Sequence, residues 1–197
     1  MTTSSQFAPG TLERVRAFIN TAVTAEEDVL SSPDRASEWL LRHELLDAAE
    51  EIGAADLVFL SDWRRALRDV ALANNGGAQT AAELAWGDMR DRAARLPLRL
   101  LVGQTPEQTS IVPAGTSAQR VAGRLAGYLY DGVKAGTFRR LKACPEQTCL
   151  YAFYDHSKNA SATWCSMAVC GNRAKARRRR EREKGDQGGF EGWQPSA

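Results

Sequence analysis

The sequence predicts a mainly α-helical protein: a helical domain with one short β-hairpin, followed by a small zinc finger with four cysteine ligands. Three observations carry this prediction. Apolar residues recur at helical spacing over most of residues 11–135, all four cysteines of the 197-residue chain lie between positions 144 and 170, and a run of arginines follows them. We expect the finger to consist of a β-hairpin and a basic carboxyl-terminal helix.

The helices of the first domain follow from apolar spacing and from start and stop signals. Helices are expected over 11–22, from Ser32 onward, over 57–73, 80–95 and 116–135. Ser32 followed by Pro33 is typical of a helix start, because serine caps free backbone N–H groups and proline has none to lose. Asn-Asn-Gly-Gly at 74–77 ends the third helix, and Gly136 ends the last.

Two short strands interrupt this helical pattern. Residues 98–103 and 109–113 are rich in aliphatic side chains and are separated by Gly-Gln-Thr-Pro, so they predict a hairpin. The expected organisation is a helical sensor or regulatory domain over 10–137 and the zinc finger over 138–184. Residues 1–9 and 185–197 are polar or rich in glycine and are predicted to be disordered.

The cysteines have the spacing Cys144-x4-Cys149-x15-Cys165-x4-Cys170. Zn2+ takes four thiolates in a closed tetrahedron, and two cysteine pairs supply such a shell with no open position. One structural Zn2+ would also stabilise a segment too small for a core of its own. Two disulfides, or four reduced thiols that bind no metal, are the alternatives. The sequence begins MTTSSQFAPG, without the basic and apolar regions of an export leader, so we expect a cytoplasmic protein with reduced thiols.

The charge of the chain is distributed unevenly. Residues 138–184 contain twelve Lys and Arg against four Asp and Glu, which is +8, and the net charge of +2 for the whole chain leaves −6 for the rest. Clustered cations gain affinity for nucleic acid by releasing counterions from phosphates. A solvated helix face, or a tail that docks on the acidic domain of the same chain, is the alternative interpretation.

At residues 164–175, Trp-Cys-Ser-Met-Ala-Val-Cys-Gly-Asn-Arg-Ala-Lys resembles the signature of the CGNR zinc-finger family, and 155–159, Asp-His-Ser-Lys-Asn, resembles its upstream element. Residues 17–21 and 30–40 resemble the helical domain that precedes this finger in stress-induced transcription regulators. The resemblance implies zinc ligation by the four cysteines and a role in transcription. Lys158 stands where the family has arginine, and Ala162-Thr163 stands where it has basic residues.

We expect the carboxyl-terminal helix to contact DNA. Gly171, with a positive φ, would follow the second cysteine turn, and Asn172 would cap a helix from Arg173 to about Lys184. Such a helix fits the major groove, where arginine reads guanine and asparagine reads adenine. The candidate nucleic-acid contacts are Lys158, Asn172, Arg173, Lys175, Arg177, Arg178, Arg179, Arg180 and Arg182.

Asn20 and Thr21 are polar residues beside the apolar stripe of the first helix. Buried amides require partners, so a capping or inter-helix hydrogen bond is one interpretation. The other is that both residues line a pocket for a small-molecule effector, together with Trp39 and Trp63.

No motif indicates an enzyme. The two histidines, His43 and His156, lie 113 positions apart, the metal uses every cysteine, and Gly76-Gly77 lacks the lysine of a phosphate-binding loop. No apolar run approaches the length of a membrane span.

A DNA-binding transcriptional regulator is therefore the leading interpretation, and a DNA-binding protein of this size often forms a homodimer. The alternative is an RNA-binding or protein-interaction adaptor, in which exposed Tyr151, Tyr154 and Trp164 would stack on bases unless they pack on the metal site.

Overall fold

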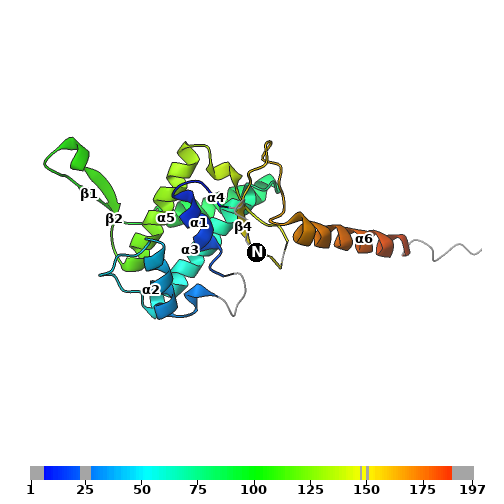
Figure 1. Cartoon of the computed structure of the whole chain (residues 1–197), viewed down its shortest axis with the longest axis horizontal. Coiled ribbons are helices and arrows are strands. Elements are labelled where there is room, and N and C mark those ends of the chain that lie inside the picture. Colours follow the sequence, from blue (N-terminus) through cyan, green and yellow to red (C-terminus); the bar gives the residue numbers. More distant parts are fainter. Residues whose placement is uncertain (1–6, 23–27, 147, 150, 188–197) are drawn as a thin grey trace, which may run out of the picture.

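The computed structural model describes residues 7–22, 28–146, 148–149 and 151–187 (Figure 1). Over these residues the protein is mainly α-helical with two small antiparallel sheets, which confirms the predicted fold class. The helices are α1 Leu12–Ile19, α2 Pro33–Arg42, α3 Ala54–Ala73, α4 Gln79–Ala93, α5 Ser117–Lys134 and α6 Asn172–Gln187, and the strands are β1 Leu98–Leu101, β2 Ser110–Pro113, β3 Leu141–Ala143 and β4 Ala152–Tyr154.

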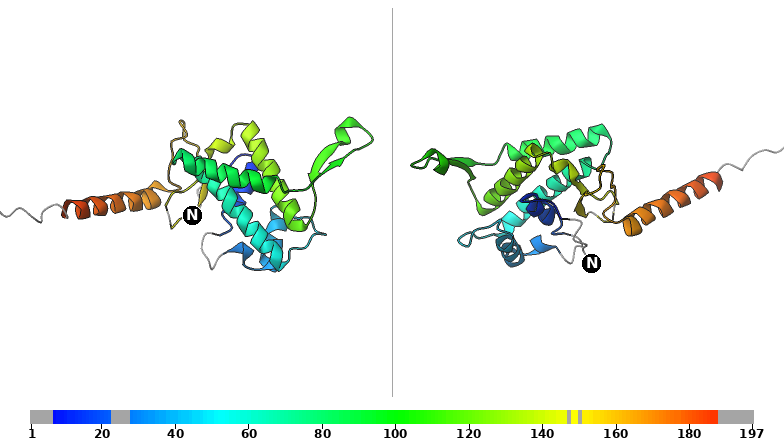
Figure 2. Two further views of the ribbon diagram at one scale, coloured as in Figure 1. Left: turned by 180° about the vertical axis from the view of Figure 1, so that it is seen from behind. Right: turned by 45° about the horizontal axis from the view of Figure 1, so that its top comes forward.

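Helix α3 runs through the middle of the helical body and packs against α1, α4 and α5 (Figures 1 and 2). Its apolar stripe includes Leu60, Trp63, Leu67 and Val70, each at most 1% exposed. The spacing of these residues places them on one helical face, so burial of that face holds the body together.

The start and stop signals seen in the sequence act as predicted. The Ser32 hydroxyl accepts from Arg35 N ahead of α2. At α5, Thr116 Oγ1 accepts from Gln119 N, and the Gln119 side chain accepts from Thr116 N, which forms a capping box. Gly136 follows this helix with a φ of 69°, a conformation that glycine adopts without strain.

Three predicted boundaries need correction. Helix α1 ends at Ile19 rather than at residue 22, because the side chain of Asn20, its C-cap, binds β4. At the amino-terminal end, residues 7–9 are described and Ala8 is buried, whereas residues 1–6 lie outside the described ranges. Helix α6 continues to Gln187, so the segment predicted to be disordered from 185 is helical for its first three residues; residues 188–197 lie outside the described ranges.

The two hairpins have opposite environments. β1 and β2 pair from Leu98 with Pro113 to Leu101 with Ser110 and form an arm that projects from the body (Figures 1 and 2). β3 and β4 are buried instead. Apolar side chains of β3, β4 and the preceding turn belong to the same cluster as those of α1, α3 and α5; they are Phe138, Leu141, Ala143, Ala152 and Tyr154. The first part of the finger is thus built into the helical core.

Across the described ranges, none of the helices combines the length and the apolar character that crossing a bilayer requires.

Candidate metal centre and nucleic-acid interface

The structure brings all four cysteines together. Cys144 follows β3 directly, and the Sγ atoms of Cys144, Cys149, Cys165 and Cys170 lie within 4.8 Å of one another. Cys149 Sγ is 3.4 Å from Cys165 Sγ, which is 3.7 Å from Cys170 Sγ. Thiolates about 2.3 Å from a tetrahedral Zn2+ lie roughly 3.8 Å apart, whereas a disulfide needs about 2.05 Å. The four free thiols are therefore positioned to hold one metal ion.

The electrostatics of the cluster favour a bound cation. Burial raises the pKa of Cys165, and the neighbouring thiols raise it further. Burial also raises the pKa of Cys170 to about 12; Cys149 and Cys144 add to this effect, whereas the hydrogen bond with Cys165 opposes it. Burial opposes ionisation of Cys149 as well, but the backbone N–H of Tyr151 and the other thiols outweigh it, so this pKa is lowered. Thiols this close resist joint ionisation, and a divalent cation compensates four thiolates at once.

Aromatic residues of the finger pack inward. Tyr151 and Trp164 are partly buried against the cysteine cluster with Phe153, and Tyr154 belongs to the helical core. Of the two interpretations for these aromatics, packing on the metal site describes Tyr151 and Trp164.

The segment that joins the metal site to α6 differs from the prediction. The Ser166 hydroxyl accepts from Val169 N and caps a π-helical turn, Met167–Gly171, which runs directly into α6. Gly171 does not have a positive φ; it lies where a Cβ would come within 2.3 Å of Met167 Sδ. Asn172 is helical and donates to Ala168 O, so it is not the cap. Because the helical run begins earlier than predicted, it carries Cys170 itself.

Most cations of α6 are exposed. Between Asn172 and Glu183, only Ala174 is buried. Among the described cations between Arg173 and Arg182, Arg177 reaches back to the turn after Cys144: its Nη1 donates to both carboxylate oxygens of buried Glu146, at 3.0 and 3.1 Å. Four cations border one shallow surface hollow together with Glu181, namely Lys175, Arg178, Arg179 and Arg182.

The upstream motif at 155–159 has a structural role. Asp155 is 1% exposed, and its carboxylate accepts from Lys142 Nζ at 2.8 Å and from the backbone N–H groups of Ser157 and Ala162. Lys142 Nζ also donates to Ala160 O and Ala162 O. These bonds fix the loop on which Lys158, a candidate nucleic-acid contact, is exposed.

The predicted effector residues have other partners. Asn20 Nδ2 donates to Ala152 O at 2.9 Å and Asn20 Oδ1 accepts from Ala152 N at 2.7 Å, so this side chain ties α1 to β4. Thr21 Oγ1 donates to Phe18 O and accepts from Arg64. Trp39 stacks on His43, and Trp63 is buried in the core. The polar side chains of Asn20 and Thr21 are therefore accounted for by hydrogen bonds, which was the interpretation proposed as an alternative to an effector pocket.

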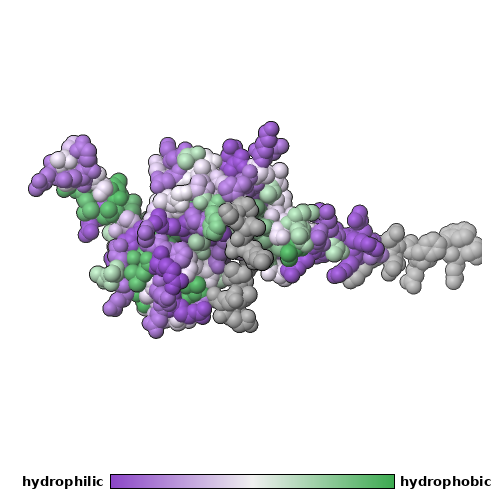
Figure 3. Space-filling model, viewed as in Figure 1, coloured by the Kyte–Doolittle hydropathy of each residue, from purple (hydrophilic) through white to green (hydrophobic). Residues whose placement is uncertain are grey.

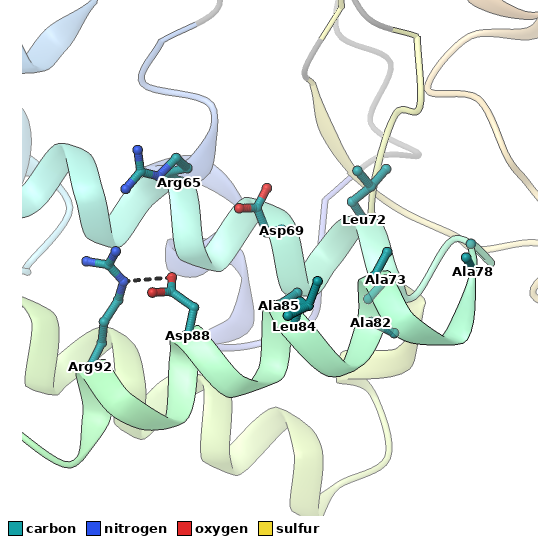
Figure 4. A pocket seen from close by; sticks show the side chains of 12 residues that line it. Arg65, Asp69, Leu72, Ala73, Ala78, Ala82, Leu84, Ala85, Asp88 and Arg92 are labelled. Carbon is teal, nitrogen blue, oxygen red and sulfur yellow. Dashed lines mark hydrogen bonds and ion pairs between the residues drawn. The ribbon is translucent and has the colours of Figure 1, made fainter.

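A cavity of about 510 Å³ lies elsewhere, between α3 and α4 (Figure 4). Alanine side chains line much of it, and Asp88 and Arg92 form an ion pair of 2.8 Å at one end. Burial raises the pKa of Asp69 in its wall. None of the four predicted effector residues lines this cavity.

Sequence reasoning missed the residues that attach the finger to the body. Asn74 Nδ2 donates to Phe138 O and Leu141 O, and Asn75 Nδ2 donates to Ala143 O and Thr163 O. The sequence showed these asparagines only as a helix stop. Their position directly after a long helix with a buried face was the one feature of the sequence that could have indicated this attachment.

No curated protein matches the chain. Residues 140–183 match the family model of the CGNR zinc finger. The matched range contains all four cysteines, the Asp155 loop and the exposed cations of α6. The carboxyl-terminal part of this chain therefore matches the CGNR zinc finger, as its sequence signature predicted.

Proposed function

We propose that the protein is a DNA-binding transcriptional regulator in which a structural Zn2+ fixes α6 for contact with duplex DNA. One observation carries the proposal: the cluster of four cysteines and the basic helix share one continuous helical run, so an ion bound by Cys170 sets the direction of α6. The 16 residues of α6 span about 24 Å and fit a major groove about 12 Å wide.

The cysteines would bind Zn2+ as a closed four-sulfur shell with no open position. The ion would supply folding free energy rather than chemistry, so we assign the chain no catalytic role. Arg177 and Glu146 add a second attachment between the finger and α6, because this ion pair joins the turn after Cys144 to the second turn of the helix.

The cations bordering the hollow on α6 are the proposed phosphate contacts. Lys175, Arg178 and Arg182 have their charges exposed on one face, as sequence-independent affinity requires. Lys158 would extend this surface from the Asp155 loop. We favour DNA over unpaired RNA because Tyr151 and Trp164 pack on the cysteine cluster and Tyr154 in the core, which reduces the ring surface they offer for stacking on bases.

The test is the salt dependence of DNA affinity. Zinc-loaded protein is titrated with a duplex selected from a random pool, over a series of salt concentrations. Changing Lys175, Arg178 and Arg182 to Ala should reduce the slope of log K against log salt by about 0.9 for each phosphate that is no longer neutralised, or roughly 2.7 at most.

A matched control removes the same amount of charge from the body. Arg42, Arg65 and Arg90 are exposed, with 64%, 63% and 79% of their side chains accessible, and changing them to Ala should leave the slope as it is. The proposal fails if both triple variants behave alike, or if single-stranded RNA competes better than the selected duplex.

A further inference from the structure

The arm formed by residues 98–113 exposes an unusual concentration of apolar side chains. Leu98, Leu100, Leu101, Val102 and Ile111 are between 40% and 75% exposed. The other large apolar side chains exposed in the described residues are distributed over α-helices, the amino-terminal segment and the finger. Single exposed apolar residues are common on protein surfaces, but five on one 16-residue hairpin require an explanation.

The strand register gathers several of these side chains on one face. Leu98 lies opposite Pro113, and Leu100 lies opposite Ile111. Because side chains alternate between the faces of a strand, these four residues share one face, and Arg99 lies on the other. That face carries no charge. In the space-filling view the stem of the arm is apolar and its tip is polar (Figure 3).

The arm is supported by the rest of its own chain at its base, where β2 contacts α5. Its sheet has two strands, so within the part of the chain that the structure describes the outer edge of each strand lacks a strand partner. It is attached at its base, where Ala114 N donates to Pro97 O and Pro113 packs on Gly123 of α5. A lone hairpin with an uncovered apolar face is marginal in water, and unpaired edges favour association with another chain.

Charge and symmetry indicate which partner covers this face. The segment 98–113 contains one Arg and one Glu, so two copies of it do not repel each other. A two-fold contact brings each surface against itself, and an uncharged apolar face is complementary to itself. Nucleic acid would require cations here, which the face lacks.

We propose that the arm is a self-association surface, on which the apolar faces of β1 and β2 from two copies of this chain pack against each other. The arm and α6 lie at opposite ends of the molecule in every view (Figures 1 and 2). A dimer formed through the arms therefore leaves both basic helices uncovered. The proposal does not rest on DNA binding, and its test contains no nucleic acid.

The experiment measures the mass of the zinc-loaded full chain by light scattering and sedimentation equilibrium over a concentration series around the micromolar range. The wild-type protein should approach twice the 21.6 kDa of one chain. Leu100→Glu and Ile111→Glu each place two unpaired carboxylates in the two-fold contact. Each variant should raise the dimer dissociation constant by about 100-fold or more.

The control is Leu84→Glu on α4, where the native side chain is 75% exposed. It introduces the same charge on a different surface and should leave the dimer intact. Circular dichroism and zinc content establish that each variant is folded. A wild-type protein that stays at 21.6 kDa overturns the proposal, and so does a dimer that survives both arm variants.

Discussion

Lys142 and Asp155 form an ion pair that is almost closed off from water. The side chain of Lys142 is 7% exposed and that of Asp155 is 0% exposed. The pKa of Asp155 is lowered to about 2, because the Lys142 ammonium and the hydrogen bonds from Ser157 outweigh the effect of burial. Removing one partner leaves the other charge buried and unpaired. The free energy lost in this way is larger than the free energy that the intact pair contributes to stability.

Asp155→Asn should therefore reduce the free energy of unfolding by about 3 kcal/mol at pH 7.5, measured by urea denaturation of the zinc-loaded protein. Asp131→Asn, at an exposed position of α5, should change it by about 0.5 kcal/mol or less. The contribution of Asp155 is fully present above about pH 5, where the group is ionised in both states, and is lost as pH falls toward 2, because its folded-state pKa is the lower one. Equal effects of the two substitutions would show that the pair is dispensable.

At the scale of single residues, the sequence predicted those functional side chains that a sequence motif identifies without knowledge of distant contacts. Four cysteines in two pairs are visible as a set, and the structure brings them together. The Arg177 contact was not predictable, because Glu146 is 31 positions away and neither residue type indicates the other. Asp155 was recognised only as part of a motif; its burial depends on Lys142 in β3, which the charge count treated as one more cation.

The ends of two helices attach the finger to the body. Asn20 at the end of α1 makes two hydrogen bonds with Ala152 in β4, and Asn74 and Asn75 at the end of α3 donate to four backbone carbonyls. Backbone groups this close to a core need partners, so the asparagines complete both the helix ends and the strands of the finger.

Asn74→Ala should remove the partner of two carbonyls, Phe138 O and Leu141 O, and should destabilise the protein by about 2 kcal/mol. Thermal or urea unfolding measures this destabilisation. Asn159→Ala, at an exposed position of the Asp155 loop, is the matched control and should have an effect near zero. If the two alanine variants unfold alike, the asparagine contacts do not support the finger.

Elements with a long apolar repeat were predictable, and elements that depend on distant contacts were not. Helices α3 and α5 follow from periodicity and from the residues at their ends, and the arm follows from two aliphatic runs around a turn, because those signals lie within each segment. The early end of α1 depends on Asn20 meeting β4, about 130 residues later. Gly171 was misplaced because glycine usually ends a helix, whereas here it makes room for Met167.

Across the whole molecule, the finger and the helical body share one core. Phe138, Leu141 and Tyr154 lie within the range predicted for the finger, yet they are buried among residues of α1, α3 and α5. The cysteine cluster forms a second, smaller group with Phe153. Two kinds of support therefore act on the finger: apolar packing holds β3 and β4, and the metal site holds the segments that carry Cys149, Cys165 and Cys170.

Metal removal should separate these two kinds of support. Because β3 and β4 are anchored by the core and by Asn20, Asn74 and Asn75, we expect them to stay folded after a strong chelator extracts the ion. The segment from Trp164 through α6 depends on the cysteine cluster and should lose its fixed position. Hydrogen exchange followed by mass spectrometry should show faster exchange over 164–187 and continued protection over 141–143 and 152–154. Exchange that rises equally over α3 and α5 would mean that the metal supports the entire fold, and unchanged exchange over α6 would mean that the cysteines hold no structural ion.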